Sequence, residues 1–257
     1  MNDVDTLSRH LAGNRFMPVP SPQLISCGDG DFRTIGAEFL ARVVHATGLA
    51  PSQRVLDIGC GIGRLALPMT QYLDEAGSYD GVDPILPAIA WCVANISAVY
   101  PNMRFHHMDV SHPIYNTNGT LDATAVRLPF EDETFDVVCM ISVLTHLHTA
   151  EVLRWASETA RVLAPGGCCF ATGFLMNGPA RAALTAGEGR IGFDPSEPGP
   201  IYESNPNVPL AGVAFDEDFL VEKFLRHGLR RRIPAEYGQW SGRAGSSFQD
   251  ICIFEKG

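Results

Sequence analysis

Apolar residues along the chain form short continuous runs that alternate with longer segments in which they recur at helical spacing. The runs predict five strands, which are RVLDIG (54–59), SYDGVD (78–83), MRFHHMDV (103–110), FDVVCMISV (135–143) and CCFATGFLM (168–176). The segments between them predict helices over 35–49, from Gly63 onward, over 85–100 and over 150–163. This alternation predicts an α/β fold around a mostly parallel sheet.

The last part of the chain predicts a different kind of strand pairing. FDEDFLVEKFLRHGL (215–229) predicts a helix with an acidic start and a basic end, and two strands follow it, RRRIPAEYG and SFQDICIFEK. The connection between these strands is too short for a helical crossover, so we expect them to be antiparallel. The expected sheet has seven strands and is mostly parallel, with an antiparallel C-terminal edge hairpin.

The division into domains follows from composition. Residues 1–34 are rich in Pro and Gly and are expected to form an N-terminal leader or cap. Residues 35–257 are expected to form one domain, since a chain of 257 residues does not require two. Within it, residues 177–212 are rich in Gly, Pro, Ser and Asn, which predicts a lid-like insertion.

Charge and hydropathy exclude several classes of partner. The formal net charge is -10 and no long basic tract occurs, so nucleic acid is not an expected partner. Neither a membrane span nor the apolar region of a signal peptide is found, which predicts a cytoplasmic protein without a membrane partner. The seven cysteines lack metal-ligand spacing and are expected to be buried free thiols. Composition gives no indication of the oligomeric state.

The stretch VLDIGCGIGRLALPM (55–69) carries the most specific chemical signal. Gly59, Gly61 and Gly63 lie between a strand and a helix, where a ligand can approach the backbone and helix N-terminal amides. The glycines are two residues apart, and Arg64 occupies the place of the third glycine of a dinucleotide fingerprint. A dinucleotide site is therefore disfavoured.

Two acidic residues define the expected ligand. Asp57 lies in the first strand, where its carboxylate is able to receive an ammonium group, and Asp83 closes the second strand, where it is able to accept two ribose hydroxyls. Taken singly, Asp57 also fits a helix cap and Asp83 an Asx turn. Their co-occurrence with the glycine loop predicts a ligand with an amine, a carboxylate and a ribose.

With these motifs the chain resembles the class I, Rossmann-like S-adenosylmethionine-dependent methyltransferases. VLDIGCGIGR resembles their first motif, YDGVDP their second, LPFEDETFDVV the segment that enters strand four, and RVLAPGG the turn that enters strand five. The resemblance extends from about residue 35 to 176. It implies a three-layer Rossmann-like fold and S-adenosyl-L-methionine as cofactor.

The resemblance also implies a set of cofactor contacts. Asp57 would hold the methionine amino group and Asp83 the ribose hydroxyls. The other implied cofactor-binding residues are Gly59, Cys60, Gly61, Gly63, Pro84, Asp109 and Val110. For the adenine contact two positions stay open: Asp109, at the end of the third expected strand, is favoured, and Asp122, ahead of LPF, is the alternative.

Histidines supply the candidate base and a rejected metal site. His146, in THLH after the fourth expected strand, is the candidate catalytic base for an acceptor hydroxyl, with His148 as the neighbouring alternative. Either ring is equally able to cap the next helix. His106 and His107 alternate on a strand and so cannot face one ion, and no metal is expected.

The expected function is methyl transfer from S-adenosylmethionine to a small-molecule acceptor, with a hydroxyl of a sugar or secondary metabolite favoured over N- or C-methylation. A non-catalytic cofactor-binding module of the same fold is the alternative. A nicotinamide-dependent oxidoreductase is disfavoured by Arg64. The aromatic residues Phe193, Tyr202, Tyr237 and Trp240 are candidates for an acceptor wall or for ordinary packing.

Overall fold

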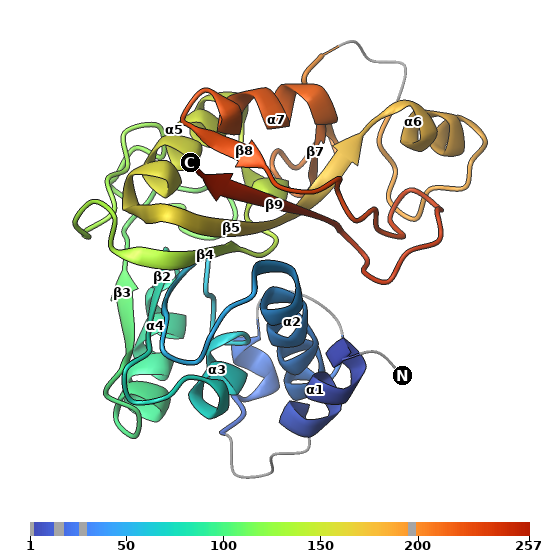
Figure 1. The fold of residues 1–257 in the computed structure, drawn as a ribbon. Helices are drawn as coiled ribbons and strands as arrows, with labels where there is room; N and C mark the ends of the chain where they lie inside the picture. The colour runs from blue at the N-terminus through green and yellow to red at the C-terminus, as the bar shows by residue number, and fades with distance from the viewer. Residues whose placement is uncertain (1–2, 13–17, 26–29, 195–198) are drawn as a thin grey trace. The chain divides into compact units, whose positions relative to one another are not determined.

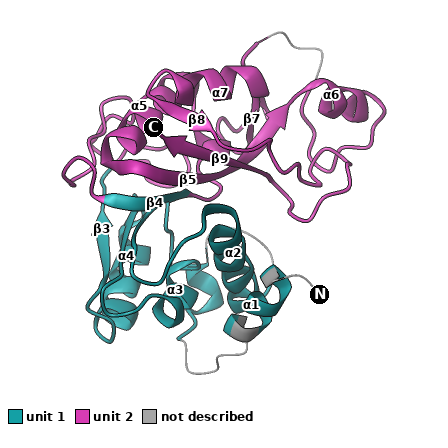
Figure 2. Cartoon of the chain, in the orientation of Figure 1, with its two compact units in different colours: residues 1–109, 135–139 teal, residues 110–134, 140–257 magenta. Residues whose placement is uncertain are grey.

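The structure is a computed structural model that describes residues 3–12, 18–25, 30–194 and 199–257. Parts of the expected leader (1–2, 13–17, 26–29) and of the expected lid (195–198) lie outside the described residues. Two compact units are distinguished, one of residues 1–109 and 135–139 and the other of residues 110–134 and 140–257 (Figure 2). The division at residue 34 stays a prediction.

The first unit is built on parallel strands in the order β3-β2-β1-β4; β2, β3 and β4 are labelled in Figure 1. The strands are β1 (Arg54–Ile58), β2 (Ser78–Asp83), β3 (Met103–His107) and β4 (Phe135–Met140). The register pairs Asp57 of β1 with Gly81 of β2 and with Cys139 of β4. Because all four strands are parallel, the residues that follow them leave the sheet at one edge.

Helices account for the rest of the first unit. They are α1 (Asp3–Ala12), the short η1 (Pro22–Leu24), α2 (Phe32–Thr47), α3 (Ala66–Tyr72) and α4 (Leu86–Cys92), which continues into a π-helical turn, η2 (Val93–Ser97). The sequence did not predict α1, because most of its residues are polar. Leu11 is nevertheless buried and α1 packs against α2. Asp31 caps α2 through the Thr34 amide, and Gly48 ends it in a left-handed conformation (φ 76°).

Helix α2 packs closely against the chain that follows β1. A Cβ atom on Gly36 would lie 2.2 Å from the Arg64 carbonyl oxygen, and the Arg64 guanidinium lies over the Phe32 ring, 5.3 Å from its centre. Since only glycine permits this approach, α2 fixes the position of the end of the glycine loop.

The second unit combines parallel and antiparallel pairing. Its elements are η3 (Leu144–His146), α5 (Thr149–Val162), β5 (Leu163–Met176), α6 (Gly178–Thr185), β6 (Ile201–Glu203), β7 (Val213–Asp216), α7 (Glu217–Leu225), β8 (Leu229–Arg231) and β9 (Asp250–Lys256). Strand β5 is parallel to β7 and antiparallel to β9, and β8 is antiparallel to β9. The expected mostly parallel sheet with an antiparallel C-terminal hairpin is confirmed.

The structure also corrects the expected boundaries in this unit. The described residues contain nine strands, because β6 and β7 form a further antiparallel pair that the sequence did not predict. Residues 213–216 form β7, whereas we expected residues 215–216 to begin the following helix. These strands are too short for an alternating pattern to distinguish them from the adjoining loop and helix. The segment 177–212 therefore contains α6 and β6 rather than irregular chain alone.

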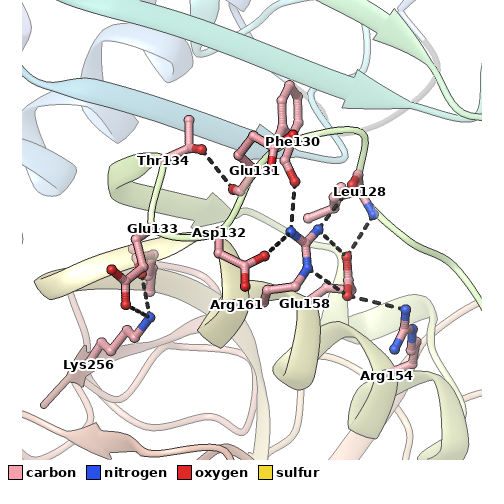
Figure 3. A network of polar contacts seen from close by, with 11 residues as sticks. Leu128, Phe130, Glu131, Asp132, Glu133, Thr134, Arg154, Glu158, Arg161 and Lys256 are labelled. Carbon is pink, nitrogen blue, oxygen red and sulfur yellow. Dashed lines mark hydrogen bonds and ion pairs between the residues drawn. The ribbon is translucent and has the colours of Figure 1, made fainter.

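A buried ion pair fastens the segment that leads into β4. Arg161 of α5 donates to the carbonyl oxygens of Leu128 and Phe130, at 3.0 and 2.7 Å, and to the Glu158 carboxylate at 2.7 Å (Figure 3). Glu158 also accepts from the Leu128 amide at 2.7 Å. Burial opposes ionisation of Glu158, but the Arg161 and Leu128 hydrogen bonds outweigh it and lower the pKa of this carboxyl.

Replacing Gly36 with alanine is predicted to destabilise the protein. An alanine in a helix interior normally adds stability relative to glycine, but here its Cβ would meet a backbone oxygen at 2.2 Å. We expect Gly36→Ala to lower the free energy of unfolding in urea by about 1–3 kcal/mol. Gly192→Ala is the control, since nothing lies within 4 Å of its Cβ position. A stabilising effect of Gly36→Ala would contradict the close packing.

Candidate cofactor site and candidate base

The glycine loop has a backbone that other residues rarely adopt. Gly59, Gly61 and Gly63 have φ angles of 74°, 52° and 79°, all in the left-handed region. The Gly59 amide donates to the Val82 carbonyl at 2.8 Å, so the start of the loop is attached to β2. A Cβ atom on Gly61 would meet nothing within 4 Å, whereas one on Gly63 would lie 3.0 Å from Ile96. The backbone at Gly61 therefore faces open space.

Asp83, at the end of β2, holds this loop in place. Its Oδ2 accepts from the Gly61 amide at 2.8 Å and its Oδ1 from the Ile85 amide at 2.8 Å. The Asx turn considered as an alternative is present, and the same side chain also fixes the glycine loop. Burial raises the pKa of Asp83, although the two amides oppose the shift. Because a carboxylate has about four acceptor positions, two hydrogen bonds do not exhaust it.

Asp57 is a second buried carboxylate at the same edge of the sheet. It is 2% exposed, and the Tyr79 hydroxyl donates to its Oδ2 at 2.5 Å. It does not cap a helix, which was the alternative interpretation. Burial raises the pKa of Asp57 to about 7; the Tyr79 hydrogen bond opposes this rise and the Asp83 charge adds to it.

Asp80, on the other face of β2, is a buried acid that has basic partners. Arg104 donates to both of its oxygens, at 2.9 and 2.6 Å, and His106 lies 2.8 Å from Oδ1. Burial opposes ionisation of Asp80, but these partners outweigh it and lower the pKa of this carboxyl. In the described part of the chain, neither Asp57 nor Asp83 has an arginine or lysine within ion-pair distance. Neither acid at the loop therefore has an arginine or lysine partner, and we call the two acids uncompensated in this sense, although His107 also acts to lower the pKa of Asp83.

Cys60 lies under the loop rather than on its open side. Its thiol donates weakly to the Gly61 carbonyl oxygen at 3.7 Å, as Cys92 does at 3.9 Å. A Cβ atom on Gly81 would lie 2.8 Å from the Cys60 Sγ, so Gly81 provides the room for this side chain. Burial raises the pKa of Cys60 well above its usual value, and the thiol is an inert packing group. All six described cysteines are buried and free.

The two candidate adenine contacts differ in their surroundings. Strand β3 ends at His107, so Asp109 lies two residues beyond the strand rather than at its end. It is half-buried, and the preceding Met108 amide donates to the Asp83 carbonyl at 3.1 Å. Asp122 belongs to the second unit and is exposed, and its Oδ1 accepts from the Thr124 amide and hydroxyl at 2.8 and 2.7 Å.

Two other expected cofactor residues and the neighbouring histidines have defined partners. The Pro84 carbonyl lies 3.1 Å from His107 Nε2, whereas His106 faces Asp80, so the adjacent histidines have separate partners. Val110 is buried in the second unit and bridges to Leu121. No group of three or more potential metal ligands occurs among the residues that the structure describes.

His146, the candidate base, lies in the second unit with both ring nitrogens engaged. Nδ1 is 2.8 Å from the Leu210 carbonyl oxygen, and Nε2 is 3.0 Å from the Tyr115 hydroxyl. Because a carbonyl only accepts, Nδ1 carries the proton, and Nε2 of the neutral ring accepts from Tyr115. Burial lowers the pKa of His146; the Leu210 carbonyl opposes this shift and His112 adds to it. The ring is therefore a neutral acceptor near pH 7.

The backbone around His146 is strained at two non-glycine residues. Leu210, whose carbonyl accepts the hydrogen bond from His146 Nδ1, has a φ of 63°, and Ser142 has a φ of 60°. Such conformations cost about 1–3 kcal/mol each and concentrate at functional sites. His148, in contrast, is exposed, and its amide donates to Glu151 at 2.6 Å at the start of α5. The capping interpretation therefore describes His148 and not His146.

The aromatic residues near the segment 177–212 are packing residues for the most part. Phe193, Tyr202 and Trp240 are at most 5% exposed and share a core cluster with Phe174. The Tyr237 hydroxyl donates to the Glu217 carboxylate at 2.9 Å. An acceptor wall made of the three buried rings is thus not supported.

Comparison with known proteins identifies the part of the chain that holds the glycine loop. Residues 55–167 match the family described as "Methyltransferase domain". The match covers less than half of the chain, and we refer to residues 55–167 as the methyltransferase domain. This domain includes Asp57, the glycine loop and Asp83, together with the strands that follow them. The resemblance to class I, Rossmann-like methyltransferases is confirmed.

A curated relative is similar to part of this chain in sequence, and two solved structures are similar to it in fold. The chain is 32% identical over 115 residues to the 23S rRNA (uracil(1939)-C(5))-methyltransferase RlmD of Pseudomonas putida, covering 42% of this chain and 25% of that protein. The PH0226 protein of Pyrococcus horikoshii has a TM-score of 0.61 at 16% identity, over 92% and 96% of the two chains. The 1,6-didemethyltoxoflavin-N1-methyltransferase of Burkholderia thailandensis, with bound S-adenosylhomocysteine, has a TM-score of 0.55 at 16% identity, over 84% and 76%.

The matches cover only part of the curated relatives and show only the fold of the solved structures. The chain spans less than half the length of the first curated relatives that it matches. The structural likenesses, at identities of 16%, show the shared fold. Among the described helices of the methyltransferase domain and its surroundings, none is long and apolar enough to cross a membrane.

Sequence reasoning missed three residues that contact the candidate site residues. Tyr79, which donates to Asp57, shares one face of β2 with Gly81 and Asp83, so the two-residue period of a strand was an available signal. Tyr115 and Leu210, the partners of His146, lie 31 and 64 residues from it along the chain. No local pattern connects residues so far apart.

Asp57→Asn is predicted to stabilise the ligand-free protein at pH 8. The asparagine still accepts from Tyr79 but carries no buried charge. Since the folded pKa of about 7 exceeds the ordinary 3.8, the ionised group costs stability increasingly between these pH values and fully above pH 7. We expect a gain of up to about 4 kcal/mol at pH 8 that disappears near pH 4, measured by urea unfolding.

The control for this prediction is Asp136→Asn in β4. Asp136 is paired with Arg54 at 2.9 Å, and although burial opposes ionisation, the Arg54 bonds lower the pKa of this carboxyl. Its replacement is expected to reduce stability at pH 8. A loss of stability in both variants would contradict the uncompensated burial of Asp57.

Proposed function

We propose that the protein transfers a methyl group from S-adenosyl-L-methionine to a hydroxyl of a small molecule, such as a sugar or a secondary metabolite. The observation that carries this proposal is the pair of buried, uncompensated carboxylates, Asp57 and Asp83, on either side of a left-handed glycine loop. A cationic ligand with hydroxyl donors supplies what these two groups lack.

The residues of the first unit fit this cofactor. Asp57 Oδ1 would accept from the ammonium group of the methionine part, because Oδ2 is engaged by Tyr79. The remaining acceptor positions of Asp83 match the two ribose hydroxyls. The open side of Gly61 allows the methionine part to lie against the backbone from Gly59 to Gly63. When bound, the cofactor supplies a methyl group activated by a sulfonium centre.

For the adenine contact we propose Asp109 rather than Asp122. Pro84 and Val110 are proposed as further cofactor-binding residues, as the resemblance implies. Asp109 follows a residue whose amide is bonded to the end of β2, where Asp83 would hold the ribose. Asp122 already accepts two hydrogen bonds within its own exposed turn. That turn accounts for Asp122 without a ligand.

For the base we propose His146. A hydroxyl acceptor has to lose its proton as the methyl group is transferred. The His146 imidazole is neutral and is therefore able to take up this proton. His146 lies six residues beyond the carboxyl end of β4 in the sequence. Ligands in open α/β sheets bind beyond the carboxyl ends of the strands.

The net charge of -10 and the absence of a long basic tract favour a small-molecule acceptor over nucleic acid. The cytoplasmic location stays a prediction from the sequence. Transfer to nitrogen or carbon acceptors, or cofactor binding without transfer, are the outcomes that would replace the hydroxyl acceptor.

Calorimetry with S-adenosylmethionine tests the cofactor assignment. Asp57 has to be ionised to pair with the ammonium group, so affinity is predicted to fall as the pH drops below about 7, and binding at pH 6 to release a proton. Asp57→Asn is expected to weaken binding about 10- to 100-fold and to remove this pH dependence. Asp136→Asn, in the same sheet, is expected to bind normally. Binding of NAD in place of S-adenosylmethionine would contradict the proposal.

The adenine contact is tested by comparing two variants in the same assay. Asp109→Asn is expected to weaken S-adenosylhomocysteine binding about 10- to 100-fold, since one hydrogen bond to a charged group is worth roughly 1.5–3 kcal/mol. Asp122→Asn is expected to change it less than twofold. The reverse order of effects would transfer the role to Asp122.

A further inference from the structure

The two ring nitrogens of His146 differ in their ability to take up a proton. Its Nδ1 donates to the Leu210 carbonyl at 2.8 Å, so only Nε2 is able to receive a proton. The Tyr115 hydroxyl lies directly at Nε2, at 3.0 Å. The Tyr115 hydroxyl is therefore the direct hydrogen-bond partner of the nitrogen that is able to take up a proton.

The Tyr115–His146 pair is held in this arrangement from several sides. The two rings contact edge to face, with centres 5.1 Å apart and planes at 88°. His112 donates from Nε2 to the His146 carbonyl at 3.0 Å and accepts at Nδ1 from the amides of Ile114 and Tyr115, at 3.1 and 3.3 Å. His112 thus connects η3, which carries His146, with the turn that carries Tyr115.

Leu210 fixes the orientation of the imidazole. Its left-handed backbone, with a φ of 63°, is unfavourable for a leucine, yet it directs the carbonyl oxygen at His146 Nδ1. With Nδ1 protonated in this way, Nε2 of the neutral ring has to be the acceptor. The strained residue and the tyrosine together determine which nitrogen acts as a base.

We propose that Tyr115 is the catalytic residue that contacts the acceptor hydroxyl and relays its proton to His146. This inference rests on the proposed function and specifies how a hydroxyl acceptor is recognised. Tyr115 is half-buried in a turn between exposed Ile114 and half-buried Asn116, so part of the residue reaches the surface. A phenol also has acceptor positions beside its single donor.

The relay balances in protons and electrons. The acceptor hydroxyl gives its proton to the Tyr115 oxygen as the Tyr115 proton passes to His146 Nε2. The electron pair released on the acceptor oxygen forms the new C–O bond to the methyl group, and the C–S pair remains on sulfur. The positive charge of the sulfonium is thereby replaced by that of the imidazolium, which returns its proton to water.

A purely structural latch between the turn and His146 makes different predictions from a relay. A latch affects stability and the binding of acceptor, whereas a relay affects kcat and its pH dependence. The titratable groups that face His146 are Tyr115 and His112, and His112 is bonded to the backbone and not to the reacting nitrogen. A neutral amine is nucleophilic enough to attack the methyl group before it loses a proton, so amine acceptors do not require the relay.

The first experiment observes the pair without turnover. In 15N NMR spectra of histidine-labelled protein, His146 is expected to be neutral with its proton on Nδ1 at pH 7. Tyr115→Phe is expected to raise the pKa of His146, because the lost hydroxyl stabilised the neutral ring. An unchanged pKa of His146 would contradict the hydrogen bond on which the relay depends.

The second experiment measures transfer of tritiated methyl to phenol, catechol and glucose, with benzylamine as the amine probe. Tyr115→Phe and His146→Ala are each expected to lower kcat on the hydroxyl probes about 100-fold with an unchanged KM for S-adenosylmethionine. The double variant is expected to be no slower than the slower single variant, since the residues act as a unit. The wild-type rate is expected to fall only below pH 6.5, and His146→Ala to lose this acid limb.

Tyr100→Phe is the matched control, because its hydroxyl also bonds one side chain, Gln71, at 3.1 Å. It is expected to retain full activity. Hydroxyl transfer within twofold of wild type in Tyr115→Phe, transfer to benzylamine alone, or no transfer at all despite S-adenosylmethionine binding would overturn the relay. If the wild-type protein does not bind S-adenosylmethionine, the proposed function itself is overturned.

Discussion

The hydrogen bond from the Gly61 amide to the Asp83 carboxylate is the interaction on which the candidate site depends. It holds a left-handed loop against the end of β2 and keeps a carboxylate buried at 6% exposure. The neighbouring Asp57 is buried as well, and its pKa of about 7 records the cost of a charge without a basic partner. Asp80, on the opposite face of the same strand, forms an ion pair with Arg104 and a hydrogen bond with His106. The difference between the two faces is the reason why we propose the loop side as the side that binds a ligand.

The second unit uses a different constraint, a single neutral tautomer of His146. The Leu210 carbonyl fixes the proton on one nitrogen and Tyr115 occupies the other. Both Leu210 and Ser142 adopt left-handed backbone conformations that are unfavourable for their side chains. Strain of this kind persists only where the surrounding contacts overdetermine it, which is a property of functional sites more than of ordinary loops.

Much of the methyltransferase domain was predictable because its signals are local. Strands β1 and β2 are where the apolar runs placed them, and Asp57, Asp83 and the glycines lie within them or next to them. Helix α1 was missed because its residues are mostly polar, and β6 and β7 because strands of three and four residues carry too little pattern. The partners of His146 were out of reach for another reason: Tyr115 and Leu210 meet it only through the tertiary fold. The role of Asp109 also depended on where β3 ends, at His107 rather than at Asp109.

We propose that the uncompensated carboxylates beside the glycine loop receive the amino-acid and ribose parts of S-adenosylmethionine. A crystal structure of the complex with S-adenosylhomocysteine measures this most directly. The account predicts the ligand ammonium within hydrogen-bond distance of Asp57 Oδ1 and both ribose hydroxyls on Asp83, with the Gly61 amide still bonded to Oδ2. A ligand bound elsewhere, or one whose ribose and ammonium avoid these two carboxylates, would contradict it.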